Sequence, residues 1–514
     1  MGHRPPPSGE VAVIAWSLFA LACVTATVSA AGEDAQVRAP AWVGSFYPAE
    51  APALRQAIRA YLEDAVPARA ERPLVLLAPH AAYAFSGQIA ADAYRQLDGH
   101  TYDLVVILGT DHGGLAPDRA AIHPGQGFRT PLGVAPIDRA TAASLIAADA
   151  AFVFDAAPHE REHSVEVQVP FVQVALPGAR ILPIVVGASD PMTHARIGRA
   201  LAAVLAGRQA LLVASSDLSH FPAYDDAVAS DHAILRAVAG LDTPAFREAA
   251  GREMRVGRAK LATCACGEAP LTVAMETARA LGATHGLVLS YANSGDSGLP
   301  DRSRVVGYGA VAFVAGAGGA DVGSLERRAP PPAETPLDAA DEKQLLDIAR
   351  RSIRRLVETL TLPLVRGVSA RLLRPQGTFV TLRKNGALRG CRGTVEPALP
   401  LGQAVGALAV QAAFNDRRFA PLQASELGEL RIEVSLLSAL TPVRSPDAIV
   451  VGRDGLVLRS DGHTGVFLPE VAIEQGWSRG SLLEEIGLKA GLARDAWRKA
   501  ELLTFRTSVV REPD

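Results

Sequence analysis

The sequence predicts an α/β domain with a mostly parallel sheet, followed by a smaller α+β domain. Continuous apolar runs separated by helical patterns predict the first domain, because strands buried on both faces lack polar alternation. Hairpins and amphipathic helices in mixed order predict the second domain. The chain has 514 residues, of which 49% are hydrophobic and 20% charged, so it has enough apolar material for two or three cores.

Five continuous apolar runs in the first half predict strands, and helical patterns lie between most of them. That alternation is typical of a parallel sheet covered by helices. The predicted strands are 74–78, 104–109, 181–187, 210–216 and 287–292, and the predicted helices are near 51–64, 86–97, 138–148, 192–206, 226–239 and 267–282.

The second half begins after a stretch rich in Gly, Ala and Pro, residues 317–338, which we interpret as a linker. The linker separates a first domain at 38–316 from a second domain at 339–512. The second domain is predicted to contain, in order, a helix at 341–360, a hairpin at 377–390 turning at Asn385-Gly386, a strand at 431–438, a second hairpin at 455–469 and a helical part at 481–497.

An apolar run from Val11 to Ala31 follows Arg4 and ends near the small residues Val28-Ser29-Ala30. Residues 1–31 are therefore predicted to be a cleaved signal peptide, or a membrane anchor because the run is nearly long enough to span a bilayer. Either interpretation predicts an exported, periplasmic or membrane-anchored protein. If the start codon is mis-assigned, the expected location is the cytoplasm.

The charge balance and the cysteine count exclude two broad classes. Lys plus Arg is 51 and Asp plus Glu is 54, giving a net charge of -3, whereas nucleic-acid-binding proteins usually carry a basic excess. Four cysteines in so long a chain are too few for a disulfide framework. We therefore expect no nucleic-acid partner and no fold held by disulfides.

Histidines follow three of the predicted strands. His80 comes after 74–78, His112 after 104–109, and Asp217 with His220 after 210–216. Ligands of open α/β sheets bind beyond the carboxyl ends of the strands, and those ends share one edge. A lone histidine is most often structural, but three at equivalent places predict a shared site. Neutral imidazole serves there as a metal ligand or as a general base.

A third ligand is available in Cys266, just before a predicted helix that carries Glu268 in its first turn. The helix dipole and the free backbone N–H groups of that turn favour a thiolate over a thiol. The alternative is that Cys264 and Cys266 are small core residues, which is usual for free cysteine.

The segment from His159 to His163 has the literal spacing of a zinc-protease helix, H-E-x-x-H. Pro158 stands before it, and Ser164 follows it. These neighbours favour a loop that runs into a helix over a metalloprotease helix.

Five segments together resemble the Memo family over roughly residues 38–316: PHAAYAFSG, GTDHGG, EREHSVEVQVPF, SSDLSHF and CGEAP. The resemblance implies the fold of the class III extradiol ring-cleaving dioxygenases, which hold iron with two histidines and a carboxylate. In Memo-like proteins a cysteine takes the place of the carboxylate. The implied metal ligands here are His80, His112 and Cys266.

The resemblance also places His163, Asp217 and His220 around the same pocket. His220 is the candidate acid or base. Asp217 is either a catalytic residue beside it or only a cap or a residue that orients an imidazole. One departure is Ala82, where the family usually has glycine. If that position requires a positive φ, alanine costs about 1 kcal/mol.

The thiolate ligand bears on the metal and on the activity. Because thiolate is soft, we expect Fe(II) or Cu(I), with Zn(II) as a third candidate. Because it is oxidisable, repeated oxygen activation is harder than in the dioxygenases. Three hypotheses follow: a non-haem metal-dependent oxidoreductase with a redox or oxidation role, a non-catalytic copper- or iron-handling module, and a scaffold that binds a peptide or small molecule.

LRGCRGTVEP and QAAFNDRRFAPLQASEL resemble the AMMECR family, over roughly residues 339–512. The fusion of the two domains resembles the AmmeMemoRadiSam system, which implies a radical SAM protein as partner. The alternative to a functional site in this half is a buried Cys391 among structural ion pairs. A polar cleft is predicted here at Arg389, Cys391, Asp416 and Arg417, with Arg392 and Arg418 beside them.

Overall fold

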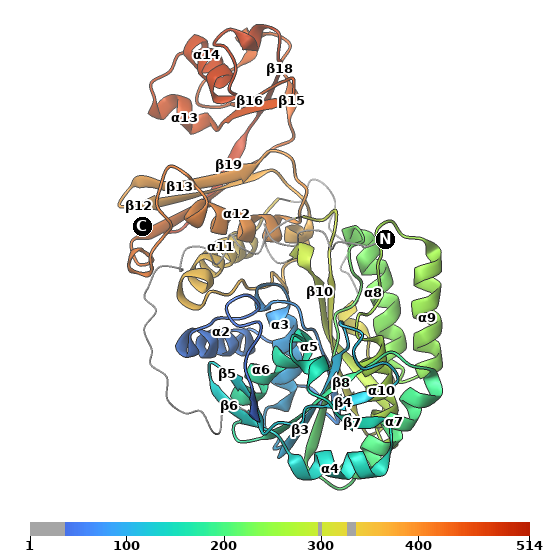
Figure 1. The fold of residues 1–514 in the computed structure, drawn as a ribbon. Coiled ribbons are helices and arrows are strands. Elements are labelled where there is room, and N and C mark those ends of the chain that lie inside the picture. The colour runs from blue at the N-terminus through green and yellow to red at the C-terminus, as the bar shows by residue number, and fades with distance from the viewer. Residues whose placement is uncertain (1–35, 297–300, 326–335, 514) are drawn as a thin grey trace, which may run out of the picture. The chain divides into compact units, whose positions relative to one another are not determined.

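The computed structural model describes residues 36–296, 301–325 and 336–513 (Figure 1). The chain divides into two compact units, one of Met1–Arg327 with Thr359–Leu364 and one of Arg328–Glu358 with Val365–Asp514. The signal peptide or anchor expected at 1–31 lies outside the described residues. Within the ranges that are described, no helix combines the length and the hydropathy needed to cross a lipid bilayer.

An eight-stranded sheet, in the order β10-β11-β2-β9-β3-β8-β4-β7, organises the first unit. Its four central strands are parallel and correspond to four of the five predicted apolar runs. Every residue of β2 and β3 is buried, as continuous apolar runs predict. The prediction of an α/β domain with a mostly parallel sheet is thus confirmed. The central strands are β2 (Val75–Ala78), β9 (Ala210–Ser215), β3 (Leu104–Thr110) and β8 (Arg180–Val186).

The outer strands add antiparallel pairs that the sequence did not predict. The fifth predicted run forms β10 (His285–Asn293), which pairs with β11 (Gly307–Val314), and β11 pairs antiparallel with β2. At the other edge β4 (Ala120–Ile122) pairs antiparallel with β8 and parallel with β7 (Phe152–Phe154). A small separate sheet contains β1 (Val37–Arg38), β5 (Gly127–Thr130) and β6 (Gly133–Pro136).

Helices pack on this sheet and bury its hydrophobic core, and each of the six predicted helices is present. Helix α10 packs against β3 and β9, and α3 packs against β2, β10 and β11. The predicted helices are α2 (Ala51–Glu63), α3 (Tyr83–Tyr94), α4 (Arg139–Ala148), α7 (Pro191–Leu205), α8 (Tyr224–Ala239) and α10 (Glu268–Ala280); three more are α5 (His163–Glu166), α6 (Gln168–Ala175) and α9 (Thr243–Val256).

The beginning of the expected linker, residues 317–325, lies against the first unit. Asp321 bridges to Leu287 of β10, and the Ser324 hydroxyl donates a hydrogen bond to the Val288 carbonyl. Leu325 is buried in the core of this unit. These residues therefore extend the packed part of the first unit.

The second unit opens with α11 (Ala339–Thr359) and contains a first antiparallel sheet, β13-β12-β14-β19. The predicted hairpin turns at Asn385 and Gly386, whose φ values of 51° and 78° are those that an Asn-Gly turn adopts. Helix α12 (Leu401–Phe414) packs on β12 and β13. The strands are β12 (Thr378–Lys384), β13 (Ala387–Thr394), β14 (Leu430–Leu437) and β19 (Thr507–Arg511).

A second antiparallel sheet in this unit has the order β15-β18-β16-β17 and contains the second predicted hairpin. The part predicted to be helical at 481–497 contains α14, which ends at Lys489 because the chain turns at Gly491 with φ 76°, and a short 3-10 helix at Ala496–Arg498. The mixed α+β character expected of this half is confirmed. The elements are β15 (Thr441–Pro442), β16 (Gly455–Ser460), β17 (His463–Phe467), α13 (Pro469–Glu474), α14 (Arg479–Lys489) and β18 (Glu501–Phe505).

Candidate metal centre

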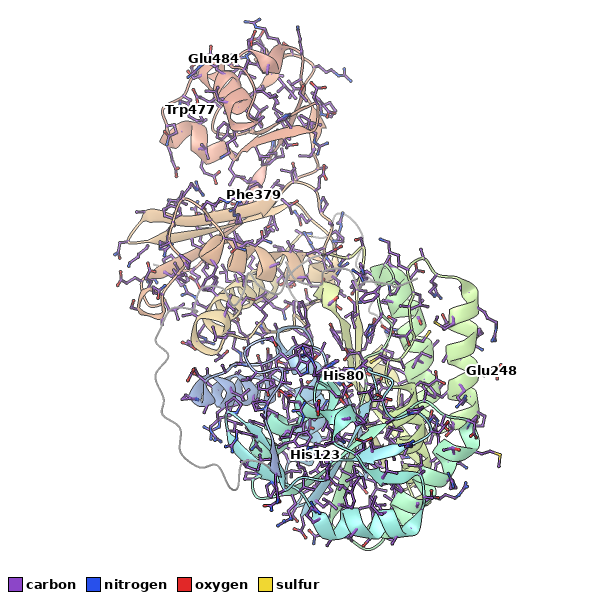
Figure 2. The ribbon with its side chains drawn as sticks, viewed as in Figure 1. His80, His123, Glu248, Phe379, Trp477 and Glu484 are labelled. Atoms are coloured by element: carbon purple, nitrogen blue, oxygen red, sulfur yellow. The ribbon has the colours of Figure 1, made fainter. Side chains whose placement is uncertain are left out.

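The carboxyl ends of β2, β9 and β3 meet because these strands are parallel neighbours in the sheet. His80 follows β2 by two residues and His112 follows β3 by two residues. His220 lies on the loop after β9, and Cys266 lies just before α10, which packs on β9. Figure 2 labels His80 within this unit.

Three potential donor atoms, one each from His80, His112 and Cys266, lie within 4.8 Å of one another. Cys266 Sγ is 3.0 Å from His80 Nε2, and the two imidazole rings stand edge to face with centroids 5.2 Å apart. Two overlapping groups share these residues, His112–Glu162–His163 and Asp217–His220–Cys266. The six residues predicted for the first-domain site therefore lie together, and no further group of this kind occurs within the described ranges.

His112 is oriented by Glu162, a residue that no motif in the sequence marks as functional. Glu162 Oε1 lies 2.9 Å from His112 Nδ1, and Oε2 accepts a hydrogen bond from the His112 backbone N–H. Burial alone would raise the pKa of Glu162, but hydrogen bonds from His112 and from the Ser164 backbone N–H lower it to about 2. An ionised carboxylate only accepts, so His112 Nδ1 carries the hydrogen of this contact and Nε2 points away from Glu162.

Aromatic rings surround His163 at the N-terminus of α5. Its ring stacks on His112 with centroids 4.6 Å apart, and it contacts Trp42 at 5.6 Å and Phe46 at 4.9 Å. Burial, with the nearby His80 and His112, lowers the pKa of His163 to about 3. His163 is therefore neutral at physiological pH, and apolar rings shield one side of the histidine cluster.

The buried donors are uncharged before any ion binds. Burial lowers the pKa of His80 to about 3, so its imidazole is neutral. Burial likewise raises the pKa of the Cys266 thiol, although Cys266 immediately precedes the N-cap of α10. The expectation that the helix dipole would favour a thiolate is thus wrong for the ion-free protein, because desolvation outweighs the dipole.

Asp217 holds the backbone of a candidate ligand. Its Oδ1 accepts hydrogen bonds from the backbone N–H groups of His80 at 2.7 Å and Ala81 at 3.3 Å, and burial raises its pKa. Its Oδ2 is 4.0 Å from His220 Nε2. His220 Nε2 is buried and has no hydrogen-bond partner, so it is open to a substrate or an ion.

The structure answers two questions that the sequence raised, the φ angle at Ala82 and the conformation of the His159–His163 segment. Ala82 has φ -55° and ψ 142°, so alanine carries no left-handed strain there. His159 is buried, bonds the Ala121 carbonyl through Nε2 and contacts His123, away from His163. The segment is a loop that enters α5, and the described residues form no metalloprotease helix.

In the second unit, the predicted cleft residues form ion pairs. Arg389 binds Glu426 through two hydrogen bonds of 2.9 Å, and Arg418 binds Asp416 at 2.9 and 2.6 Å. Asp416 also accepts the backbone N–H of Cys391 at 2.9 Å. These contacts are the structural ion pairs that the sequence left open as an alternative.

The remaining members of this set have different surroundings. The Cys391 thiol accepts a hydrogen bond from the Thr381 hydroxyl at 3.4 Å, and burial raises its pKa. Arg392 donates to the Asn415 carbonyl, and Arg417 is exposed. The described part of this unit contains no convergent metal-binding group.

Comparisons with known proteins identify two families in the chain. The model of the Memo-like protein family matches residues 38–312, and the AMMECR1 family model matches residues 346–510. A MEMO1 family protein of Methanopyrus kandleri is 35% identical over 289 residues, which cover 54% of this chain and 98% of that protein. A MEMO1 family protein of Aquifex aeolicus is 34% identical, over 54% of this chain and 100% of that protein.

A crystal structure of an uncharacterized protein from Pyrococcus horikoshii is also similar. It shares 30% sequence identity, covers 35% of this chain and 99% of its own, and has a TM-score of 0.33. The family assignment rests on the Memo match, which spans more than half of the chain. The chain belongs to the Memo family and carries an AMMECR1 domain after its Memo domain.

Proposed function

We propose that the Memo domain binds one transition metal ion through His80 Nε2, His112 Nε2 and Cys266 Sγ, and that it serves a redox role at this site. The observation that carries the proposal is the convergence of these donor atoms within 4.8 Å. Two of the donors follow strands of the central sheet and the third precedes α10, so the sheet and its covering helix hold them close together before any ion binds.

The residues present fit such an ion. Glu162 leaves the Nε2 lone pair of His112 free, which is the carboxylate–histidine arrangement common around bound metals. Cys266 Sγ lies beside His80 Nε2, so loss of the thiol proton leaves an anionic sulfur next to a neutral nitrogen. A fourth group is within reach in His220, whose Nε2 has no partner.

Ligand type narrows the choice of ion. One thiolate and two imidazoles favour Cu(I) or Fe(II), and they also accept Zn(II). Bound iron or copper would supply one-electron redox chemistry, which none of the side chains provides.

The neighbouring residues have distinct proposed roles. His220 Nε2 would hold or move a proton on a substrate, because it is buried and unpartnered. Asp217 fixes the His80 backbone and lies near His220. His163, with Trp42 and Phe46 against its ring, excludes water from one side.

Metal loading of the full chain without oxygen, followed by elemental mass spectrometry, tests the proposal. Wild type and Cys264→Ser should retain about one equivalent of Fe(II) or Cu(I), whereas Cys266→Ser and His80→Ala should lose it. Cys264 is the matched control because it is buried two residues away and contacts Ser230 and the Ala250 carbonyl instead. Equal retention by all four proteins would overturn the site.

A second experiment, which measures oxygen consumption, tests the redox role. The loaded wild type is mixed with ascorbate and air, and oxygen uptake is compared with that of the same amount of free ion. Oxygen uptake that continues in the loaded wild type but is lost in His220→Gln supports a redox role. Uptake that stops completely on binding overturns that role and leaves a metal-handling module, a function that the burial of His80 also favours.

A further inference from the structure

The Ser215 hydroxyl lies at the centre of a buried polar network behind His80. Ser215 ends β9, and its side chain is fully buried. Its Oγ is 3.2 Å from His80 Nδ1, 2.9 Å from Gln168 Nε2 and 2.7 Å from the Ser164 carbonyl oxygen. A hydroxyl has one hydrogen and two lone pairs, so three partners use all of its capacity.

The roles of two partners are fixed by their chemistry. The Ser164 carbonyl oxygen can only accept, so it receives the Ser215 hydrogen. The orientation of the Gln168 amide is set by Nε2 donating to the Pro79 carbonyl, with Oε1 accepting from the Tyr94 hydroxyl. Gln168 Nε2 therefore donates to Ser215 and occupies one of its lone pairs.

Only an acceptor position on Ser215 remains for His80, so His80 Nδ1 must carry the hydrogen. The Nε2 lone pair then faces Cys266 Sγ at 3.0 Å and accepts its thiol hydrogen in the ion-free protein. Glu162 produces the same tautomer in His112 by a different contact. Both imidazoles thus have Nδ1 engaged by a neighbouring side chain, and His80 presents Nε2 to Cys266 without any ion to orient it.

Gln168 also connects the ends of two strands. Its amide bonds the Pro79 carbonyl, immediately before His80, and the Ser215 hydroxyl at the end of β9. It is almost fully buried at the start of α6. Holding these two points together fixes the place of the His80 ring against the loop after β9.

We propose that Ser215 and Gln168 are positioning residues for His80, Ser215 by setting its tautomer and Gln168 by clamping the two strand ends. The tautomer part stands on the hydrogen-bond network alone. The consequence for metal affinity rests on the proposed function.

In the EHSVEVQ segment, residues 162–168, the polar residues that form hydrogen bonds alternate along the chain. Every second residue bonds a different part of the site: Glu162 bonds His112, Ser164 bonds the backbone N–H of Thr110, and Gln168 bonds Ser215. Glu166 accepts the backbone N–H groups of Ala41 and Trp42 and pairs with Arg38, so it holds the segment that carries the aromatic rings.

Nuclear magnetic resonance of the metal-free full chain, labelled with ¹⁵N in histidine, tests the tautomer directly. The His80 signal is assigned by its absence from His80→Gln. Wild type and the control Gln173→Met should show a protonated Nδ1 and a bare Nε2, whereas Ser215→Ala should show a mixture of tautomers. Gln173 lies on the same helix but bonds Thr130 and the Gly133 carbonyl. A wild-type His80 protonated at Nε2 would overturn the proposed tautomer. An unchanged tautomer in Ser215→Ala would overturn the role of Ser215 in setting it.

Competition with a chelator measures the effect on metal binding in the same proteins. Ser215→Ala and Gln168→Met should bind Cu(I) about 10 to 100 times more weakly than wild type, the usual loss when an outer partner of a ligand is removed. Gln173→Met should bind as wild type does. Thermal melts show whether each variant is still folded at the assay temperature. The positioning role requires that a folded variant binds Cu(I) more weakly. A folded Gln168→Met with wild-type affinity would overturn the clamp. Absence of binding by wild type would instead overturn the proposed function and leave the tautomer result standing.

Discussion

At the scale of single residues, the site depends on side chains that act on the candidate ligands rather than on an ion. Glu162 engages Nδ1 of His112 and Ser215 engages Nδ1 of His80, while Asp217 accepts the backbone N–H of His80. All three are buried, where a hydrogen bond is stronger and an unpaired polar group costs more. The geometry of the donors is therefore set before binding.

The charge of Glu162 is predicted to matter for affinity. Glu162→Gln keeps an acceptor for His112 Nδ1–H but removes the negative charge that raises the basicity of the ligand. We expect the affinity for Cu(I) to fall by about tenfold, or about 1.4 kcal/mol, in a chelator competition. Glu160→Gln changes an exposed neighbour and should have no effect. Wild-type affinity in Glu162→Gln would show that this carboxylate is structural only.

Acid titration probes the ion pairs of the AMMECR1 domain. The hydrogen bonds from Arg389 lower the pKa of Glu426 to about 2, and those from Arg418 lower the pKa of Asp416. A carboxyl group with a folded pKa below its unfolded value stabilises the fold above that unfolded value, which is about 4.3 for glutamate. The contribution is lost as pH falls through about 2.

The expected result is a fall in the thermal midpoint of the second domain between pH 4.5 and 2, with a shallower fall in Glu426→Gln. Differential scanning calorimetry across that range measures both proteins. Identical pH profiles would contradict the contribution of Glu426.

At the scale of elements, the close approach of α10 to the end of β9 places Cys266. Gly267 is the N-cap of α10, and its backbone N–H donates to the Ser216 hydroxyl at 2.9 Å. A Cβ at Gly267 would lie 2.6 Å from Ser216 Cβ and 2.8 Å from the Ser215 carbonyl oxygen. The helix therefore reaches this position only with glycine at its start.

Gly267→Ala is predicted to destabilise the Memo domain by about 1 to 3 kcal/mol, because backbone atoms must move to admit the methyl group. The same shift moves Cys266, so metal affinity should fall as well. Denaturant unfolding and chelator competition measure the two effects. Gly319→Ala, whose Cβ would meet nothing within 4 Å, is the control. Unchanged stability and affinity in Gly267→Ala would refute the tight fit.

The accuracy of the element prediction follows from the strength of each local signal. The central strands and six helices were predictable because long continuous or periodic apolar patterns specify them. Strands β4 and β7 have three residues each, too few for any pattern, and β11 contains Gly307 and Gly309. Gly307 is there for a tertiary reason, since a Cβ would lie 1.9 Å from Asp231 Oδ2.

At the scale of the whole molecule, the chain combines two units with separate hydrophobic cores, and the candidate centre lies entirely in the first. The two candidate histidine ligands were visible in the sequence because they follow strands directly, whereas Cys266 was noticed before a predicted helix and given a role by the family resemblance. Glu162, Ser215 and Gln168 were not assigned, because their partners are 50, 135 and 47 residues away and no local pattern reports such contacts.

Confinement of the centre to one unit predicts a selective thermal effect. Metal at about 100 times its dissociation constant should stabilise the Memo domain by about 2.7 kcal/mol, since it binds the folded form. Bound Cu(I) should raise the midpoint temperature of Memo-domain unfolding and leave that of the AMMECR1 domain unchanged. Calorimetry with and without Cu(I) measures both midpoints. A rise confined to the unfolding of the AMMECR1 domain would contradict a metal centre in the Memo domain.

The most direct test of the account is the absorption spectrum of the full chain loaded with Co(II), which reports a sulfur ligand. Wild type and Cys264→Ser should both show a thiolate-to-cobalt charge-transfer band in the near ultraviolet, and Cys266→Ser should lose it. This result would establish Cys266 Sγ as a ligand of the ion. A band that persists in Cys266→Ser, or is absent from wild type with cobalt bound, would contradict the two-histidine, one-cysteine centre.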